Sequence, residues 1–276
     1  MAPTSFFIAV LAGMAMLLEP TYGLSMPSSF EKRVTWWKPT AGMTWQIVLS
    51  HKLKNLAVDV STYDIDMFDT PTTTINTLHS QRRYVICYFS AGTWENWRPD
   101  AANFAAADKG HNVGSWVGEL WLNTSSPSVR NIMLKRLDLA RSKHCDAVDP
   151  DNTDAFDNTN GLGLTEQDSI DFVTFLANAA HARGMAVGLK NSGPIISDSI
   201  VSMVDFAVNE QCVHYKECQK WTPFITANKP VFGIEYPSAG AATTLTTKAK
   251  YCNNPTRTGF STLLKKMNLD DWYMRC

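Results

Sequence analysis

Four acidic residues stand at or just after short apolar segments, where paired carboxyl groups could do chemistry. They are Asp149, Asp151, Glu210 and Glu235. Asp149 and Asp151 flank Pro150, which disfavours helix, so on an extended segment their side chains can point the same way. Glu210 follows the apolar run 206–208 as a single acid. Two carboxyl groups flanking a scissile bond are what glycoside hydrolysis requires, one as proton donor and one as nucleophile or base.

Other chemistries fit these residues less well. An oxygen-rich cluster of Asp149, Asp151 and Glu210 also suits Ca²⁺ or Mg²⁺, and Glu210 has the alternative of a structural salt bridge. The cysteines lack zinc-type spacing, and the sequence contains no Gly-x-Ser-x-Gly elbow for a serine esterase. We therefore expect catalysis by carboxyl groups, with no metal and no cofactor.

These carboxyl groups need a scaffold, and the sequence alternates short apolar runs with longer amphipathic stretches. The runs are Leu56–Ser61, Tyr84–Ser90, Glu119–Leu122, Asp146–Asp149, Ala186–Lys190, Phe206–Asn209, Val231–Tyr236 and Phe260–Lys265. Trp45–Leu49 is a candidate ninth strand outside the closed sheet. Ser128–Lys143 and Thr165–Arg183 have helical spacing, and the second opens on an N-cap-like Thr165 and stops at Gly184. Eight strands alternating with helices predict an α/β fold, a (β/α)₈ TIM barrel.

Most of the predicted strands end in polar, ionisable or aromatic residues. In a barrel these ends share the C-terminal face, where catalytic groups gather. Besides the carboxyl pair, we expect substrate-binding roles there for Asp59, Tyr63, Asp64, Tyr88, Lys190, Asn191, Glu235 and Tyr236. Lys190 either lowers the pKa of the nucleophile or serves as a structural ion-pair partner. The tyrosines either stack on sugar rings or pack in the core.

Several motifs occur in an order that resembles one enzyme family. They are Tyr63–Asp66, Val85–Gly92, Trp97–Asp100, Cys145–Asn152, Gly188–Asn191 and Val208–Cys212, and they span the chain from about Trp36 to the C-terminus. This ordered set is similar to glycoside hydrolase family 114, whose enzymes are endo-α-1,4-polygalactosaminidases. The resemblance implies a (β/α)₈ barrel, retention of configuration, and a catalytic Asp after the fourth strand with a catalytic Glu after the sixth. The Glu is Glu210; the Asp is Asp151 or Asp149, with Asp151 favoured because it projects beyond the strand.

One position departs from the family pattern. Asn123 stands where the family usually has Asp, which leaves any subsite role of this position open. The change also creates the glycosylation sequon Asn123-Thr124-Ser125, and a glycan there would crowd a nearby cleft.

The acidic residues also bear on the substrate. Those expected in or beside the C-terminal-face loops are Asp59, Asp64, Asp66, Asp69, Glu95, Asp149, Asp151, Asp154, Asp157, Glu210 and Glu235. Such a cleft attracts a cationic polysaccharide, as a galactosamine polymer is wherever its amines are free. The simpler interpretation is a set of solvated acidic loops. Two alternatives stay open: a related α-glycosidase of the α-galactosidase type, and a carbohydrate-binding barrel without catalysis.

The composition sets the remaining expectations. The chain has 276 residues and a formal net charge of −1, so no global field favours nucleic acid or an anionic membrane. The apolar run 6–18 is too short to span a bilayer and is followed by Glu19 and Pro20. We expect a signal peptide over 1–23, an irregular lead-in over 24–44 and one barrel domain over 45–276, in a secreted, monomeric protein.

Six cysteines agree with an oxidising, extracellular compartment. Cys212 and Cys218 are close enough in sequence to close a loop. Cys252 and Cys276 are positioned to tie down the C-terminus. Cys87 and Cys145 lie in apolar runs, where a free buried thiol and a disulfide are equally compatible with the pattern.

Overall fold

A computed structural model describes Met1 and residues 34–237 and 245–276. Apart from Met1, the expected signal peptide and the first ten residues of the lead-in lie outside the described residues. The centre of the fold is a nine-stranded sheet in the order β1-β2-β3-β7-β8-β9-β10-β11-β12. Its strands are β1 Trp45–Val48, β2 Thr62–Asp66, β3 Tyr84–Ser90, β7 Ala147–Asp151, β8 Ala186–Lys190, β9 Phe206–Glu210, β10 Val231–Glu235, β11 Ser261–Leu264 and β12 Met274–Arg275. The first eight are parallel, and β12 is antiparallel to β11.

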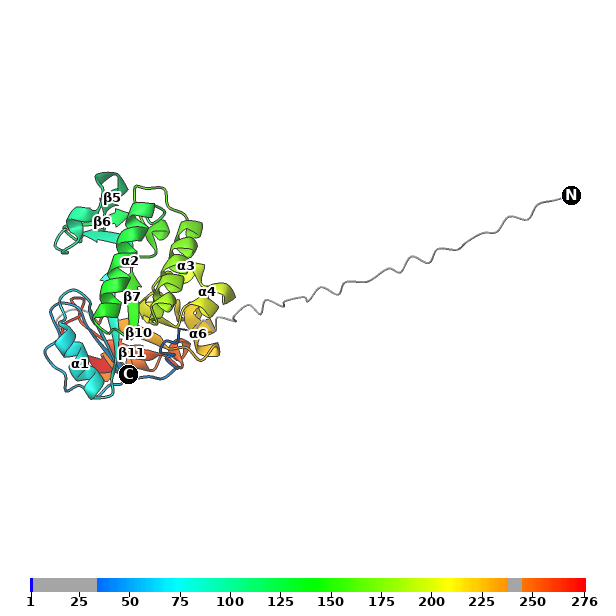
Figure 1. Cartoon of the computed structure of the whole chain (residues 1–276). Helices are drawn as coiled ribbons and strands as arrows, with labels where there is room; N and C mark the ends of the chain where they lie inside the picture. Colours follow the sequence, from blue (N-terminus) through cyan, green and yellow to red (C-terminus); the bar gives the residue numbers. More distant parts are fainter. Residues whose placement is uncertain (2–33, 238–244) are drawn as a thin grey trace. The chain divides into compact units, whose positions relative to one another are not determined.

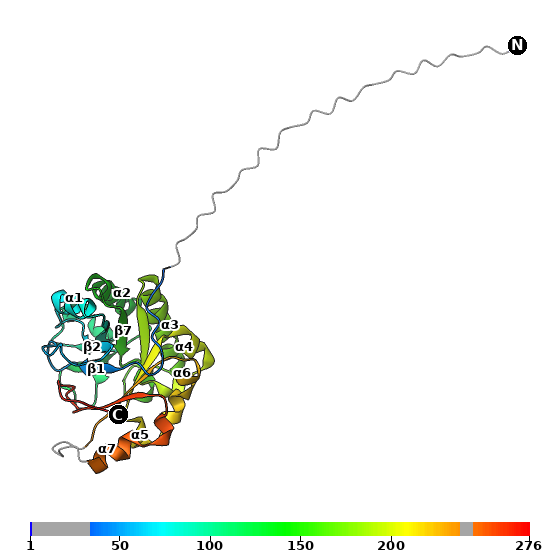
Figure 2. The same cartoon turned by 90° about the horizontal axis from the view of Figure 1, so that it is seen from below.

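Helices cover the outer face of this sheet. They are α1 Thr72–Ser80, α2 Pro127–Ser142, α3 Glu166–Ala182, α4 Asp198–Met203, α5 Cys212–Tyr215, α6 Thr222–Thr226 and α7 Leu245–Cys252. Figure 2 shows α1, α2, α3, α4 and α6 in an arc around the parallel strands. The predicted helices match α2 and α3 to within one residue at each end. Thr165 and Asp168 form a reciprocal capping box at the start of α3. None of the described helices is long and apolar enough to cross a membrane.

Three strand predictions are wrong, although the total of eight parallel strands is right. Leu56–Ser61 is not a strand; β2 begins only at Thr62, and its sequence Thr-Tyr-Asp-Ile-Asp is fully buried despite two acids. Trp45–Val48 is not outside the sheet but pairs with β2 as its first strand. Glu119–Leu122 is strand β6 of a separate antiparallel sheet with β4 Thr93–Glu95 and β5 Lys109–Asn112. This small sheet stands at one end of the parallel strands (Figure 1).

The two faces of the parallel sheet bury different residues. One core lies between strands and helices, and a second, smaller core includes Trp45, Ile86, Ala147, Phe206 and Phe232. Because side chains two residues apart share a face of a strand, the second core continues along each strand toward its C-terminal end. There it gives way to ionisable side chains, so the inner face is apolar at one end and charged at the other.

The first and last parallel strands meet through side chains. Trp45 Nε1 donates to the carbonyl of Ser261 at 2.8 Å, and the Ser261 hydroxyl donates to the carbonyl of Met43 at 2.6 Å. Lys265 Nζ donates to Gln46 Oε1 at 3.2 Å. These contacts join β1 to β11 and give the curled sheet the arrangement of an α/β barrel.

All six cysteines form disulfides. The pairs are Cys87–Cys145, Cys212–Cys218 and Cys252–Cys276. The predictions for the second and third pairs are confirmed. For Cys87 and Cys145, which the sequence leaves as thiols or a disulfide, the structure has the disulfide. It ties β3 to the residues just before β7, the strand that delivers the Asp149–Asp151 segment.

Candidate active site

The last residues of three strands lie close together at the C-terminal end of the barrel. Asp151 ends β7, Lys190 ends β8 and Glu210 ends β9. The residue after each one has a positive φ, 60° for Asn152, 46° for Asn191 and 63° for Gln211. Asparagine adopts this left-handed conformation more readily than most residues. Each strand therefore stops abruptly, and its last side chain projects beyond the sheet.

Lys190 lies between the two carboxylates. Its Nζ is 3.2 Å from Asp151 Oδ2 and 3.3 Å from Glu210 Oε2, and its side chain is only 2% exposed. Burial alone lowers the pKa of a lysine, but Asp151, Glu210 and Asp149 outweigh it and raise the pKa of Lys190 well above its ordinary value. Lys190 is therefore a permanent cation that holds the two carboxyl groups close together.

Both carboxylates receive further hydrogen bonds. The Tyr88 hydroxyl donates to Asp151 Oδ2 at 2.8 Å. Glu210 accepts from Asn191 Nδ2 at 2.9 Å on one oxygen and from the Tyr236 hydroxyl on the other. Burial raises the pKa of Glu210, but Lys190, Tyr236 and Asn191 stabilise the charged form more, so its pKa lies below its ordinary value. Glu210 is accordingly ionised in the substrate-free protein.

Asp149 and Asp151 have different surroundings although both point to the same side of β7. Asp151 lines a cleft and its side chain is 15% exposed. Asp149 is fully buried one layer deeper and does not line the cleft. Burial raises the pKa of Asp149 to about 7. Of the two aspartates, only Asp151 lies where a substrate can touch it.

The cleft consists of two adjoining hollows of about 490 Å³ and 340 Å³. Both are lined by Asn191, Glu210, Tyr236, Trp116 and Met267, so the two hollows meet at Glu210. Exposed aromatic side chains border them: Trp116 is 57% exposed, Trp97 in the larger hollow 53%, and Tyr215 in the smaller one 62%. The result is a groove that extends to both sides of Glu210, with flat apolar rings along it.

Acidic side chains dominate this groove. The two hollows are lined by nine acids, Asp66, Asp69, Glu95, Glu119, Asp151, Asp154, Asp157, Glu210 and Glu217, and by three bases, Arg98, Lys190 and Lys220. Arg98 is already paired, with Asp66 at 2.8 Å and with both oxygens of Glu95 at 2.7 and 2.9 Å. Lys220 pairs with Glu217 at 2.7 Å. The groove therefore carries a surplus of negative charge.

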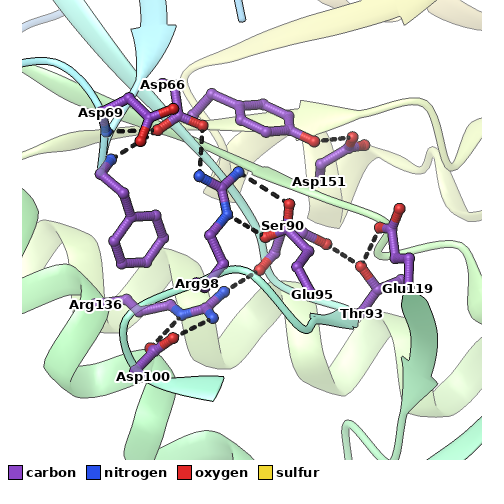
Figure 3. Close-up of polar contacts among 12 residues, drawn as sticks. Asp66, Asp69, Ser90, Thr93, Glu95, Arg98, Asp100, Glu119, Arg136 and Asp151 are labelled. Carbon is purple, nitrogen blue, oxygen red and sulfur yellow. Dashed lines mark hydrogen bonds and ion pairs between the residues drawn. The ribbon is translucent and has the colours of Figure 1, made fainter. Parts of the chain in front are cut away.

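Figure 3 shows how the acidic side chains of the larger hollow are held. Asp66, Arg98 and Glu95 lie in a row beside Thr93 and Glu119. The Thr93 hydroxyl donates to Glu119, and Asn152 Nδ2 contacts the same oxygen at 3.4 Å. Burial raises the pKa of Glu119 to about 7. Gly92 lets the chain pass close to Asn152, because a Cβ at this glycine would lie 1.7 Å from the Asn152 carbonyl oxygen.

Comparison with known proteins identifies the family of the chain. Residues 27–276 match the model of glycoside-hydrolase family GH114. The chain belongs to this family. The Aspergillus fumigatus protein Ega3, solved in complex with galactosamine, has 49% sequence identity and a TM-score of 0.85, with 88% of this chain and 98% of Ega3 covered. The glycoside hydrolase domain of PelA from Pseudomonas aeruginosa has 13% identity and a TM-score of 0.66, with 84% and 97% covered, and shares the fold. No curated protein matches the chain.

Membership of GH114 confirms the resemblance seen in the ordered motifs. GH114 enzymes are endo-α-1,4-polygalactosaminidases, and this chain is a glycoside hydrolase acting on a carbohydrate. Counted along the parallel sheet, β7 is the fourth strand and β9 the sixth. Asp151 and Glu210 are thus the last residues of the fourth and sixth strands.

Of the eight predicted substrate-binding residues, four line the cleft of this GH114 protein and four do not. Tyr88, Lys190, Asn191 and Tyr236 line it. The other four, Asp59, Tyr63, Asp64 and Glu235, are corrections to the sequence-based prediction.

The corrections have two structural causes. The strand predicted to end at Ser61 instead begins at Thr62. Asp59 therefore precedes β2 and is exposed, whereas Tyr63 and Asp64 lie within the strand and are fully buried. Glu235 is buried because its carboxylate turns back to accept the backbone N–H of Val213 at 2.7 Å.

Sequence reasoning missed the cleft residues Glu119, in strand β6, and Trp116, in the connection between β5 and β6. Trp116 lies in a connection without apolar periodicity, and Glu119 was assigned to a barrel strand. Asn123, the position that departs from the family pattern, does not line either hollow; its backbone N–H donates to the Asp108 carbonyl at 2.8 Å.

Among the described residues, one group brings three potential metal ligands together. Cys212, Cys218 and Glu235 have ligand atoms within 4.8 Å of one another. The two sulfur atoms are joined in a disulfide, so neither is a free thiolate. These three residues instead stabilise the loop that follows Glu210, through the disulfide and the hydrogen bond from Val213 to Glu235.

Proposed function

We propose that the chain is a secreted, endo-acting hydrolase of α-1,4-linked galactosamine polymers, with Asp151 and Glu210 as its catalytic carboxyl pair. The observation that carries this proposal is the position of Lys190 Nζ, 3.2 Å from Asp151 and 3.3 Å from Glu210, at the floor of the cleft. Glycoside hydrolysis requires two closely spaced carboxyl groups, and here each of two strands supplies one of them.

The charge of the groove supports a cationic substrate. Nine acids and three bases line it, and all three bases are paired with acids of the groove itself. A galactosamine residue with a free amine is a cation, and the 49% identical Ega3 has been crystallised with galactosamine. A negative groove raises the local concentration of such a polymer and speeds its association at low salt.

The shape of the groove supports endo action. Hollows extend to both sides of Glu210 and Tyr236, so sugar units can be bound on either side of the cleavage point. Trp116 borders both hollows and is 57% exposed. An indole ring there offers a stacking surface to the apolar face of a sugar.

The same geometry favours a retaining mechanism. Retaining glycosidases have carboxyl groups about 5–5.5 Å apart, and inverting ones about 6.5–9.5 Å. Because one nitrogen contacts both, the Asp151 and Glu210 oxygens can be no farther apart than the sum of the 3.2 Å and 3.3 Å contacts.

We assign the nucleophile to Asp151 and the proton donor to Glu210. Asp151 attacks the anomeric carbon while protonated Glu210 gives its proton to the leaving oxygen, which produces a glycosyl–Asp151 ester. Glu210, now a carboxylate, takes a proton from water, and the resulting hydroxide displaces Asp151 and restores both groups. Glu210 must be protonated to act as the donor, but Lys190, Tyr236 and Asn191 stabilise its ionised form and lower its pKa. We therefore expect the highest activity at acidic pH.

Secretion is part of the proposal. The signal peptide over 1–23, the lead-in over 24–44 and a single closed (β/α)₈ domain over 45–276 fit a monomeric extracellular enzyme. Three disulfides among the described residues are typical of an oxidising compartment. The described part of the lead-in is fastened to the domain, since Trp36 Nε1 and Lys38 Nζ both contact Asp205 Oδ1, at 3.0 and 2.9 Å.

The test compares three isosteric variants on a de-N-acetylated α-1,4-galactosamine polymer, with products analysed by mass spectrometry. We expect Glu210→Gln and Asp151→Asn to lose at least about a hundredfold in turnover, and Asp149→Asn to keep cleaving. Internal fragments of several lengths support endo action. Turnover within tenfold of wild type for Glu210→Gln contradicts the proposal. Added azide assigns the roles, because it yields a glycosyl azide of opposite configuration in the nucleophile and acid–base variants.

A further inference from the structure

One buried carboxyl group of the groove has no cationic partner. Five of the nine acids that line the groove form a salt bridge with one of its three bases; they are Asp66, Glu95, Asp151, Glu210 and Glu217. The other four form no salt bridge with a described residue; they are Asp69, Glu119, Asp154 and Asp157. Three of these four are half-buried or exposed, whereas Glu119 is only 8% exposed. Glu119 is therefore a buried acid of the groove without a counter-ion.

The two oxygens of the Glu119 carboxyl group have different surroundings. Oε1 accepts a hydrogen bond from the Thr93 hydroxyl, and Asn152 Nδ2 lies 3.4 Å from the same oxygen. Oε2 accepts no hydrogen bond from any described residue, yet it is not fully buried. In Figure 3 a dashed line reaches one oxygen of Glu119 and none reaches the other. Because Glu119 lines the larger hollow, Oε2 is available to a group that binds there.

Glu119 lies near the carboxyl pair but is held by a different part of the chain. It is the first residue of β6 in the small antiparallel sheet, opposite Glu95 of β4. Asn152, whose side chain approaches Glu119, directly follows Asp151. Asp151 and Glu119 also line the same hollow. A polymer that occupies this hollow therefore lies against both residues.

An ionised Glu119 lacks the charge compensation that a buried carboxylate requires. Thr93 and Asn152 are neutral donors. Arg98 lines the same hollow, but its guanidinium group already contacts one oxygen of Asp66 and both oxygens of Glu95. Burial accordingly raises the pKa of Glu119 to about 7. A cation bound in the hollow removes this penalty, because it supplies the positive charge that the protein does not.

We propose that Glu119 binds an ammonium group of the substrate through Oε2 and thereby selects, at this position of the groove, a galactosamine unit without an N-acetyl group. An ammonium group has three N–H donors and the charge that Glu119 lacks. An N-acetyl group is uncharged, so it leaves the buried carboxylate uncompensated. This role rests on the proposed function, since it requires a galactosamine polymer as substrate.

The protonation of Glu119 changes when the ammonium group binds. In the free protein the raised pKa keeps Glu119 protonated in acidic solution. A positive charge at Oε2 favours the ionised form, so in the complex Glu119 is ionised at lower pH than in the free protein. An N-acetyl group has no such effect.

The first experiment uses a partially N-acetylated α-1,4-galactosamine polymer and compares wild type, Glu119→Gln and Asp69→Asn. Glu119→Gln removes the charge and keeps an amide oxygen that accepts from Thr93. Asp69→Asn is the control, because it removes an exposed acid from the same hollow. The products are sequenced by tandem mass spectrometry, which gives the acetylation of each unit counted from the newly formed chain ends.

Wild type and Asp69→Asn should yield products with galactosamine at one fixed position from the cleavage point. Glu119→Gln should admit N-acetylgalactosamine at that position. Its kcat/KM for the fully de-N-acetylated polymer should fall about ten- to a hundredfold, as expected for the loss of a hydrogen bond between two charged groups. If Glu119→Gln keeps the fixed galactosamine, the proposal is overturned.

The second experiment leaves Glu119 unchanged and remains decisive if Glu119→Gln does not fold. A crystal structure of Glu210→Gln with a short de-N-acetylated oligomer should place one amine nitrogen about 2.7–3.2 Å from Glu119 Oε2. An oligomer bound in the groove with no amine at this distance contradicts the proposal.

Failure of the proposed function gives a different pattern. If wild type does not cleave the polymer, or if Glu210→Gln and Asp151→Asn both keep wild-type turnover, the proposed function is wrong. If cleavage needs both carboxyl groups but Glu119→Gln retains the wild-type acetylation pattern, only the role of Glu119 is wrong.

Discussion

Replacing Tyr236 by Phe removes one hydrogen bond from Glu210 and leaves the aromatic ring in place. The Tyr236 hydroxyl donates to Oε1, and Asn191 and Lys190 remain as partners of Oε2. A hydrogen bond to a charged group contributes about 1.5–3 kcal/mol, and about 1.36 kcal/mol corresponds to one pH unit. Because the Glu210 side chain is 24% exposed, solvent screening favours the lower end of that range.

The pKa of Glu210 should therefore rise in Tyr236→Phe, and one limb of the pH profile should move upward by about one unit. If Glu210 donates the proton, the alkaline limb moves, because Glu210 stays protonated to higher pH. If Glu210 were the nucleophile, the acidic limb would move instead, because Glu210 would ionise only at higher pH. Release of reducing ends from the de-N-acetylated polymer, measured as kcat/KM across the pH range of the folded protein, separates the two results.

Tyr88→Phe is the matched control, because the Tyr88 hydroxyl makes the corresponding bond to Asp151 Oδ2 at 2.8 Å. With Asp151 as nucleophile, its loss should alter the acidic limb and leave the alkaline limb unchanged. The reasoning is refuted if both variants give profiles that superimpose on wild type, or if the alkaline limb of Tyr236→Phe moves downward.

Three further predictions concern the groove and the stability of the domain. Trp116→Ala should raise KM for the polymer about two- to tenfold, the effect of losing one aromatic contact of about 0.5–1.5 kcal/mol, with kcat nearly unchanged in steady-state assays. Cys87→Ser should lower the free energy of unfolding by about 4 kcal/mol and Cys212→Ser by about 2 kcal/mol, because the first disulfide spans 58 residues and the second spans 6; equal urea midpoints would contradict this. Asp205→Asn should cost about 3 kcal/mol in the same assay, because the buried Asp205 carboxylate pairs with Lys38 and accepts from His181.

The parts of the fold that could be predicted from sequence are those in which local pattern and burial agree. α3 has a capping box at Thr165, an apolar stripe and Gly184 with φ of +73° at its end, and each signal is readable along the chain. β8 is apolar until its last residue, Lys190, and β9 is apolar until its last two residues, Asn209 and Glu210. The same contrast between an apolar strand and a charged end located the candidate site.

The parts that could not be predicted are those in which tertiary contacts override the local pattern. β2 carries Asp64 and Asp66 in a fully buried strand, where Asp66 is paired with Arg98 at 2.8 Å. A search of the sequence for apolar runs therefore selected residues 56–61, which precede β2. β6 is apolar at Leu120–Leu122 but pairs antiparallel to β4 and β5, and sequence spacing alone does not reveal a strand's partner.

The junction of β1 with β11 has a consequence for how the chain acquires its structure. The Trp45–Ser261 hydrogen bond joins residues 216 positions apart, and the Gln46–Lys265 bond joins residues 219 apart. Contacts this distant in sequence form slowly, because the loop entropy is lost before the contact is gained. Until residue 261 has emerged during synthesis, β1 and β10 each have an edge with no neighbouring strand. A chain that stops short of Ser261 therefore presents two open strand edges to other molecules and is prone to aggregate.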